Sequence, residues 1–254
     1  MGRTVAIIQG RMSSSRLPGK ILMDIAGEPM LMRVVERARQ AKSVDEVVFA
    51  TTTDPTDDPV AEYCQARAIA CWRGSLPDVL DRFYQASRHF EAETIVRLTA
   101  DCPLLDPALV DETVALFRSH GADFAANRLP PPYPRTYPIG LDCEVCTFAA
   151  LERAWREAAA PHEREHVLPY LYEIEGRFKV AVLDYKLNYG SLRWTVDTAQ
   201  DLEVVRQVYQ RLAGRSDFTW LDVLAIFERE PELAKINAQV EHRNMYDVDE
   251  RYKK

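Results

Sequence analysis

The sequence predicts an α/β fold, in which helices cover a mostly parallel β-sheet. Short apolar runs of strand length, beginning with Val5–Ile8, alternate with amphipathic segments of helical length over the first 126 residues. The apolar runs are typical of strands that are buried on both faces. Several of them end in polar or glycine-containing loops, and open α/β sheets bind ligands at such strand ends.

The first half of the chain alternates strands and helices, as a layered α/β domain requires. The predicted strands are residues 5–8, 45–52, 68–72 and 94–98, and the predicted helices are residues 30–41, 60–66, 78–90 and 107–120. A turn is expected at residues 24–29. Because parallel strands end at one edge of a sheet, the residues that follow them should gather there. These residues are Arg11, Asp54, Arg73 and Asp101.

The pattern changes near residue 127. Residues 127–138 contain five prolines, and a long ordered loop in a compact domain usually has a function. Beyond this loop the predicted strands are residues 141–147, 178–183 and 193–197, and the predicted helices are residues 148–160, 162–172 and 198–212. Pro169 interrupts the second of these helices, and Thr198 is a candidate N-cap of the third. A short helix and a polar tail are expected at the end.

The loop after the first strand contains three cations, Arg11, Arg16 and Lys20, among glycines and serines. Glycines let backbone N–H groups approach a ligand, and hydroxyl groups donate hydrogen bonds to it. Three like charges repel one another unless an anion lies between them, so the loop predicts an anion site rather than a basic surface loop. It matches neither the G-x-G-x-x-G pattern nor the Walker A loop, which requires Ser or Thr where Ile21 follows Lys20.

The composition limits the kinds of partner. The formal net charge of −7 disfavours nucleic acid and leaves the basic loop suited to a small anion. No signal peptide precedes the first strand, and no apolar run approaches the roughly 20 residues that span a bilayer. Five scattered cysteines indicate reduced thiols. We therefore expect a cytoplasmic protein with no membrane partner.

Asp101 follows the predicted strand at residues 94–98, and Asp197 is the last residue of the predicted strand at residues 193–197. Mg²⁺ takes one or two carboxylates together with phosphate oxygens, so both residues are candidate metal ligands. The alternative is a helix N-cap, since both precede predicted helices.

Two other motifs match metal-binding patterns, but their surroundings in the sequence do not favour a metal site. His162–His166 matches H-E-x-x-H, but Pro161 and Pro169 limit the helix that a zinc protease requires. Cys143 and Cys146 match C-x-x-C. Residues three apart on a strand face opposite sides of the sheet, so we expect ordinary strand residues.

Five stretches carry a family resemblance. They are I-I-Q-G-R-M-S-S-S-R-L-P-G-K (7–20), V-L-D-R-F (79–83), R-L-T-A-D-C-P-L (97–104), E-R-E-H-V (163–167) and R-W-T-V-D-T (193–198). With them the chain resembles the cytidylyltransferases that activate acidic sugars, the CMP-sialic acid and CMP-KDO synthetase group, and within it the spore coat polysaccharide (SpsF) branch. The resemblance extends to about residue 212. Gly10 and Ala100 depart from the family pattern, which has Ala and Gly there.

The resemblance implies a Rossmann-like, three-layer α/β/α nucleotidyltransferase fold of the GT-A-like kind. Its single domain would comprise a nucleotide-binding part (1–126), a substrate and dimerisation arm (127–185), a return to the core (186–230) and a tail (231–254). In the implied reaction, CTP reacts with an acidic small-molecule acceptor to give a CMP-sugar and pyrophosphate. The implied cofactor is Mg²⁺ or Mn²⁺, and the implied assembly is a homodimer.

The resemblance also implies roles for individual residues. Arg11, Lys20 and Asp101 would act in catalysis, and Asp101 and Asp197 would hold the metal. The nucleotide would contact Gln9, Gly10, Arg11, Ser13, Arg16, Lys20, Asp54, Arg73, Ser75, Asp81 and Arg82. The acceptor would contact Asn127, Asp142, Glu144, Arg164 and His166. Arg164 is expected to pair with the acceptor carboxylate, because a guanidinium binds a carboxylate through two hydrogen bonds.

Three alternatives stay open. The first is a cytidylyltransferase that acts on a phosphonate or a phosphorylated small molecule. The second is a glycosyltransferase that uses a nucleotide sugar, although no D-x-D follows a predicted strand. The third is a nucleotide-binding module without catalytic activity.

Overall fold

The computed structural model of the chain describes residues 2–213, 215–241 and 246. Within these residues, seven strands form one sheet in the order β5-β4-β1-β6-β8-β7-β9. Their bounds are β1 (Thr4–Gln9), β4 (Glu46–Thr52), β5 (Ala70–Gly74), β6 (Thr94–Thr99), β7 (Phe124–Ala126), β8 (Glu144–Thr147) and β9 (Val180–Val182). β8 runs antiparallel to β6 and β7, and the other neighbouring pairs are parallel. The predicted mostly parallel sheet is confirmed.

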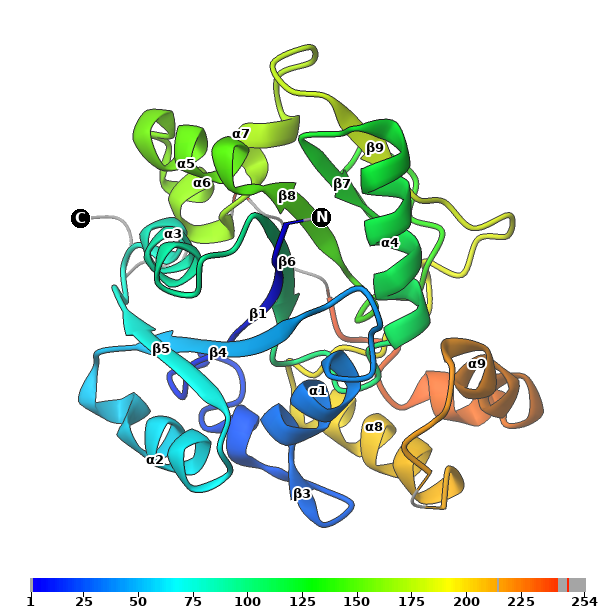
Figure 1. Cartoon of the computed structure of the whole chain (residues 1–254). Coiled ribbons are helices and arrows are strands. Elements are labelled where there is room, and N and C mark those ends of the chain that lie inside the picture. The colour runs from blue at the N-terminus through cyan, green and yellow to red at the C-terminus, as the bar shows by residue number, and fades with distance from the viewer. Residues whose placement is uncertain (1, 214, 242–245, 247–254) are drawn as a thin grey trace.

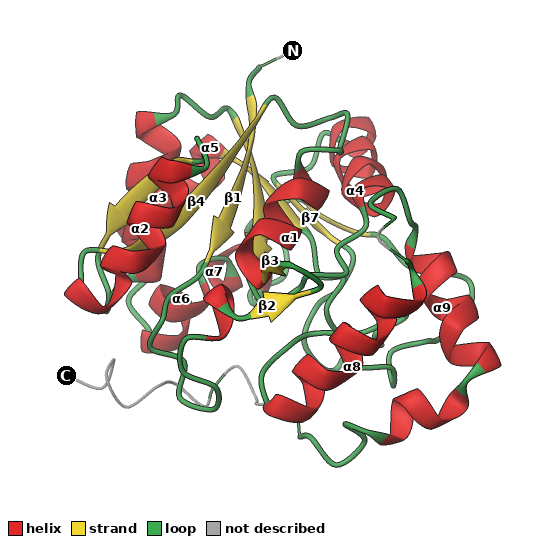
Figure 2. Ribbon diagram, turned by 90° about the horizontal axis from the view of Figure 1, so that it is seen from below, coloured by secondary structure: helices red, strands yellow, loops and turns green. Residues whose placement is uncertain are grey.

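Helices cover both faces of the sheet, as Figures 1 and 2 show. One face packs against α1 (Met30–Ala38), α2 (Asp58–Ala66) and α4 (Pro107–His120). The other packs against α3 (Val79–His89), α5 (Phe148–Glu157) and the segment that holds α7 (Pro169–Tyr172), with α6 (Pro161–His166) beside α3. The fold is therefore the three-layer α/β/α arrangement that the resemblance implies.

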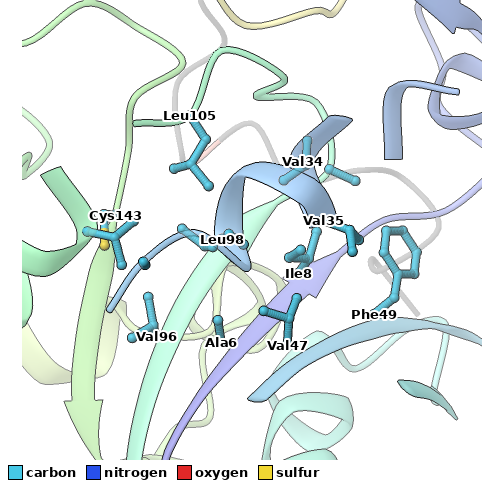
Figure 3. Close-up of a cluster of buried hydrophobic side chains, with 14 of the residues drawn as sticks. Ala6, Ile8, Val34, Val35, Val47, Phe49, Val96, Leu98, Leu105 and Cys143 are labelled. Atoms are coloured by element: carbon cyan, nitrogen blue, oxygen red, sulfur yellow. The ribbon is translucent and has the colours of Figure 1, made fainter. Parts of the chain in front are cut away.

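The alternation of side chains along β1 explains why both faces are covered. Ala6 and Ile8 belong to the core on the α1 side, and Val5 and Ile7 belong to the core on the α3 side. All four side chains are fully buried, as expected for a strand inside a parallel sheet. Figure 3 shows Val34 and Val35 of α1 above β1, together with residues of β4 and β6.

A third apolar cluster lies at the edge of the sheet where β1 and β6 end. It joins α8 (Ala199–Arg211) and α9 (Trp220–Arg229) to Trp194 and Val196. Figure 2 shows α8 and α9 beside that edge. Thr198 caps α8, as predicted, by accepting from the backbone N–H of Asp201. The two-residue strands β2 (Asp24–Ile25) and β3 (Glu28–Pro29) form a hairpin at the expected turn.

Some predicted elements differ in the structure. β7 is not predicted, because three buried residues carry no periodic signal. The predicted strand at 193–197 is wrong: the segment forms one bridge, between Ile139 and Arg193, and is otherwise extended chain. β8 begins at Glu144 rather than at residue 141. The first helix ends at Ala38 rather than at residue 41.

Three short 3₁₀ helices complete the described elements: Lys20–Leu22, Pro55–Asp57 and Pro231–Lys235. Most of the expected tail, residues 242–245 and 247–254, lies outside the described residues. No helix in the described part of the chain is long and apolar enough to cross a membrane.

Candidate active site

A cavity of about 380 Å³ opens at the edge of the sheet where β1 and β6 end and β8 begins. The loop after β1 forms one wall, and the chain that leads into β8 forms another. The predicted site residues that line this cavity are Gln9, Gly10, Arg11, Arg16, Lys20, Asp101, Asp142, Glu144, His166 and Asp197. The structure thus brings the basic loop, both candidate metal ligands and three candidate acceptor residues to one place.

Lys20 joins the two aspartates of the site. Its Nζ lies 2.8 Å from Oδ2 of Asp101 and 3.0 Å from Oδ1 of Asp197. It also donates to the carbonyl oxygen of Val196 at 2.7 Å. Burial acts to lower the pKa of Lys20, but the two carboxylates outweigh it and raise the pKa above its usual value. The ammonium is therefore firmly charged.

Asp197 has the densest charge environment in the site. Its Oδ2 lies 2.8 Å from Nη2 of Arg16 and 2.6 Å from Nη2 of Arg193. Burial acts to raise the pKa of Asp197, but the charges of Lys20 and Arg16 and the hydrogen bonds of Lys20 and Arg193 hold it far below its usual value. The carboxylate is therefore ionised at any physiological pH.

The backbone places Asp197 beside Asp101. The extended segment that follows Leu192 donates from the N–H of Trp194 to Ile139 at 2.7 Å, and from the N–H of Val196 to Asp101 at 2.8 Å. Gly140 allows this close approach, since its φ is +109° and a Cβ there would lie 2.5 Å from the backbone nitrogen of Thr195. The two aspartates are thus joined through main-chain bonds as well as through Lys20.

Neither aspartate is a helix N-cap. Asp106 caps α4 by accepting from the N–H of Ala108, and Thr198 caps α8. The alternative interpretation of Asp101 and Asp197 therefore does not hold, and their carboxylates remain available to the cavity.

The side chains that could act as ligands decide whether a divalent ion fits the site. Among the described residues, no group of three or more His, Cys, Asp or Glu side chains could hold a metal. Two carboxylates nevertheless match Mg²⁺, which takes one or two from a protein and completes its shell with phosphate and water oxygens. In this structure the Lys20 ammonium stands between the carboxylates of Asp101 and Asp197. The pair therefore fits a shared ion on condition that Lys20 turns towards phosphate oxygens.

The wall opposite the basic loop is built from guanidinium–carboxylate pairs. Arg97 pairs with Glu144 and donates from Nε to Oε1 of Gln9 at 3.0 Å. Asp142 lies between two arginines: Arg135 donates to it at 2.9 Å, and Nε of Arg128 lies 3.5 Å from its Oδ2. Arg97 and Arg128 both line the cavity, and neither was predicted.

Sequence reasoning had a signal for one of these arginines. Arg97 is a charge within the apolar run of the predicted strand at residues 94–98, which indicates a buried partner. Arg128 lies in the loop at residues 127–138, for which a function was expected, but no pattern singled it out, because β7 before it was not predicted.

Several predicted nucleotide-binding residues lie outside the main cavity. Arg73 pairs with Asp58 at 2.7 Å, and Asp54 accepts hydrogen bonds from Thr56. The other predicted residues that do not line it are Ser13, Ser75, Asp81 and Arg82. Arg82 lines a smaller cavity of about 160 Å³ that shares Gln9, Gly10, Arg11 and His166 with the main one.

Two predicted acceptor-binding residues have other partners. The buried amide of Asn127 donates to the carbonyl of Leu141 at 2.7 Å and accepts from the N–H of Cys143 at 2.8 Å. Arg164 pairs with Asp78 at the start of α3, with Nε 3.1 Å from Oδ2. Neither residue lines the main cavity.

The two histidines of the H-E-x-x-H motif have separate surroundings. His162 lies with its Nε2 2.9 Å from Glu173, whereas His166 lines the cavity. The two cysteines of the C-x-x-C motif face opposite sides of the sheet, as predicted, because Cys143 belongs to the α1-side core and Cys146 to the α3-side core.

The two departures from the family pattern lie against each other. A Cβ placed on Gly10 would lie 2.7 Å from the Cβ of Ala100 and 2.7 Å from Cζ of Phe49. The missing methyl at position 10 therefore makes room for the methyl that Ala100 adds.

Known proteins are similar to this chain in both sequence and fold. The model of the family described as cytidylyltransferase matches residues 5–214. The spore coat polysaccharide biosynthesis protein SpsF of Bacillus subtilis is 31% identical over 241 residues, covering 92% of this chain and 98% of that protein. The 3-deoxy-manno-octulosonate cytidylyltransferase of Rhodopseudomonas palustris is 30% identical over 249 residues, covering 81% and 97%. A cytidylyltransferase structure from Leptospira borgpetersenii superimposes with a TM-score of 0.86 at 29% identity, covering 96% and 100%.

Proposed function

The chain belongs to the cytidylyltransferase family, and from this premise we propose which acceptor it uses. As a CTP-dependent nucleotidyltransferase it transfers CMP from CTP and releases pyrophosphate. We propose that the acceptor is an acidic sugar of the 3-deoxy-ulosonic or nonulosonic type, and that the product serves surface polysaccharide synthesis. The names of two relatives, a 3-deoxy-manno-octulosonate cytidylyltransferase and a spore coat polysaccharide protein, support this proposal.

One observation supports the proposed binding of a triphosphate and a divalent ion. The basic loop and the two aspartates meet through Lys20, which places anion-binding groups next to carboxylates that suit a divalent ion. We propose that Asp101 and Asp197 hold Mg²⁺ or Mn²⁺, which would supply positive charge at the triphosphate. Lys20, Arg16 and Arg11 would bind the phosphates and neutralise the charge that grows on the leaving pyrophosphate.

The chain's own contribution is then mainly positioning. The acceptor hydroxyl attacks the α-phosphorus and gives up its proton to water, the bond from that phosphorus to the bridging oxygen breaks, and pyrophosphate leaves in line. The walls hold the two reactants at the same sheet edge, which removes the entropic cost of bringing them together. The smaller cavity beside Arg82 would hold part of the nucleoside.

The test is pyrophosphate release from CTP with a panel of acceptors in the presence of Mg²⁺. The panel contains 3-deoxy-manno-octulosonate, N-acetylneuraminate, 2-hydroxyethylphosphonate and phosphocholine. We expect release with at least one sugar acid, and a loss of 100-fold or more in Asp101→Asn. Arg215→Ala, an exposed substitution between α8 and α9 and outside the arm, is the control. Release only with the phosphorus-containing acceptors would favour the alternative acceptor class.

We also propose a homodimer formed through the arm at residues 127–185. Three exposed apolar side chains lie in this arm: Tyr133, Ile174 and Val180. Sedimentation of the wild-type protein is expected to give twice the chain mass, and Ile174→Asp is expected to shift it towards the monomer. A monomeric wild-type protein at micromolar concentration would contradict the proposal.

A further inference from the structure

The acceptor wall contains an excess positive charge at Arg128. Asp142 accepts from both terminal nitrogens of Arg135, and this pair is neutral. Arg128 is held against the same carboxylate through Nε, at 3.5 Å from Oδ2. Two guanidinium groups thus share one carboxylate, and these three groups together have a net charge of one positive unit next to the cavity.

Arg128 also has unused hydrogen-bonding capacity. Among the described residues, the structure gives the guanidinium of Arg128 no hydrogen bond, and its contact with Asp142 is longer than one. Its side chain is 22% exposed and lines the cavity. By contrast, the guanidinium of Arg97 is bound to Glu144 and Gln9, and that of Arg164 to Asp78.

The place of Arg128 in the sheet separates it from the phosphate-binding loop. β7 runs parallel to β1 and β6 through the pairings that link them, so Arg128 and Arg11 emerge at the same edge. Figure 1 shows β1, β6, β8 and β7 in that order across the sheet. β7 lies three strand spacings from β1, or roughly 14 Å, so Arg128 enters the cavity from a different strand end than the phosphate-binding loop does.

From these observations we infer that Arg128 binds the carboxylate of the acceptor. This inference rests on the proposed function, and it assigns the carboxylate to Arg128 rather than to Arg164. The two terminal nitrogens of Arg128 form a fork that matches a carboxylate, and Asp142 lies 3.5 Å from its Nε, on the other side of the guanidinium. Arg128 thereby selects acceptors that carry a negative charge at this end of the cavity.

The experiment compares a charged acceptor with its uncharged ester. The probes are the panel acid with the highest kcat/KM and the methyl ester of the same acid. We measure pyrophosphate release for the wild type, Arg128→Ala and Arg128→Lys. We expect Arg128→Ala to lower kcat/KM for the acid about 10- to 100-fold, because a hydrogen bond to a charged group is lost. The same variant should leave kcat/KM for the ester unchanged.

Arg128→Lys separates the effect of charge from that of geometry, because it keeps the positive charge and removes the two parallel N–H donors. We expect it to restore part of the activity with the acid. The Kd for CTP, measured by calorimetry, should be unchanged in both variants, which also shows that they are folded. Arg215→Ala is again the control.

The outcomes separate the inference from the proposed function. If the acid is a substrate and Arg128→Ala uses it as well as the wild type does, the inference is wrong and the function stands. Equal losses with acid and ester also overturn the inference, since they indicate a general structural role. If CTP binds and no sugar acid releases pyrophosphate, the proposed acceptor class fails, and the inference falls with it.

Discussion

At the scale of single residues, the site is governed by one buried ammonium group. Lys20 is 7% exposed and touches both Asp101 and Asp197. The pattern of the loop indicated an anion ligand for Lys20, and the structure adds that two carboxylates lie within 3.0 Å of its ammonium. Because Asp197 also pairs with Arg16, two cations of the loop lie close together at low electrostatic cost.

The first prediction concerns Lys20→Met, which keeps the length of the side chain and removes its charge. We expect the Kd for CTP to rise at least 10-fold, because a charge-assisted contact with the phosphates is lost. We also expect Mn²⁺ to bind more tightly without nucleotide, since no ammonium then stands between Asp101 and Asp197. Calorimetry measures both. Weaker Mn²⁺ binding in the variant would contradict the account of the two carboxylates.

The second prediction concerns the contact between Gly10 and Ala100. Gly10→Ala is expected to lower the free energy of unfolding by about 1–3 kcal/mol, because its Cβ would overlap Ala100 and Phe49. The double variant Gly10→Ala/Ala100→Gly removes one of the two overlaps. Urea unfolding should show that it recovers part of the loss. Additive losses in the double variant would argue against this packing.

At the scale of elements, the arm is attached to the sheet by a buried amide. Asn127 connects the end of β7 to the backbone just before β8 through its two bonds to Leu141 and Cys143. The proline-rich loop at residues 127–138 lies between these points. The position of Asp142 and Glu144 in the cavity therefore depends on Asn127, which does not line the cavity itself.

The third prediction follows from this attachment. Asn127→Ala leaves a buried carbonyl and a buried N–H without their partner, and should lower the free energy of unfolding by about 2–4 kcal/mol. Asn188→Ala is the matched control, because Asn188 is exposed and its side-chain oxygen accepts from the nearby N–H of Gly190. A variant of Asn127 with unchanged stability and a raised KM for the acceptor would restore the role expected from the resemblance.

At the scale of the whole molecule, the two cores make stability depend on pH. Burial raises the pKa of the thiols of Cys143 and Cys146 well above the usual value. In the unfolded chain these thiols ionise near pH 8.5, whereas in the folded chain they stay protonated. The contribution of these thiols to the free energy of unfolding is therefore complete below about pH 8.5, and it is lost as the pH rises above that value.

The fourth prediction is a steeper loss of stability at alkaline pH for the wild type than for Cys146→Ala. Each thiol that ionises only in the unfolded state lowers the free energy of unfolding by about 1.4 kcal/mol per pH unit. Urea unfolding at pH 8, 9 and 10 measures the slopes. The substitution also leaves a small cavity, but that cost is the same at each pH. Equal slopes would contradict the burial of this thiol.

The sequence alone was sufficient for features that depend on local patterns. The apolar runs predicted the parallel strands, because a strand buried on both faces needs apolar side chains at every position. The basic loop, Asp101 and Asp197 were found from their residue types and from their places after apolar runs. Family resemblance added the reaction, and the match over residues 5–214 supports it.

Only the tertiary structure decided which of these residues meet. Asn127 and Arg164 look suitable for a ligand in the sequence, and the fold brings Asn127 to Leu141 and Cys143 and brings Arg164 to Asp78. Arg128 follows a strand too short to leave a periodic signal, so its position was also beyond sequence reasoning. Hydrogen bonds and ion pairs between residues far apart in the chain depend on distance and direction in space, and the sequence pattern of one segment contains neither.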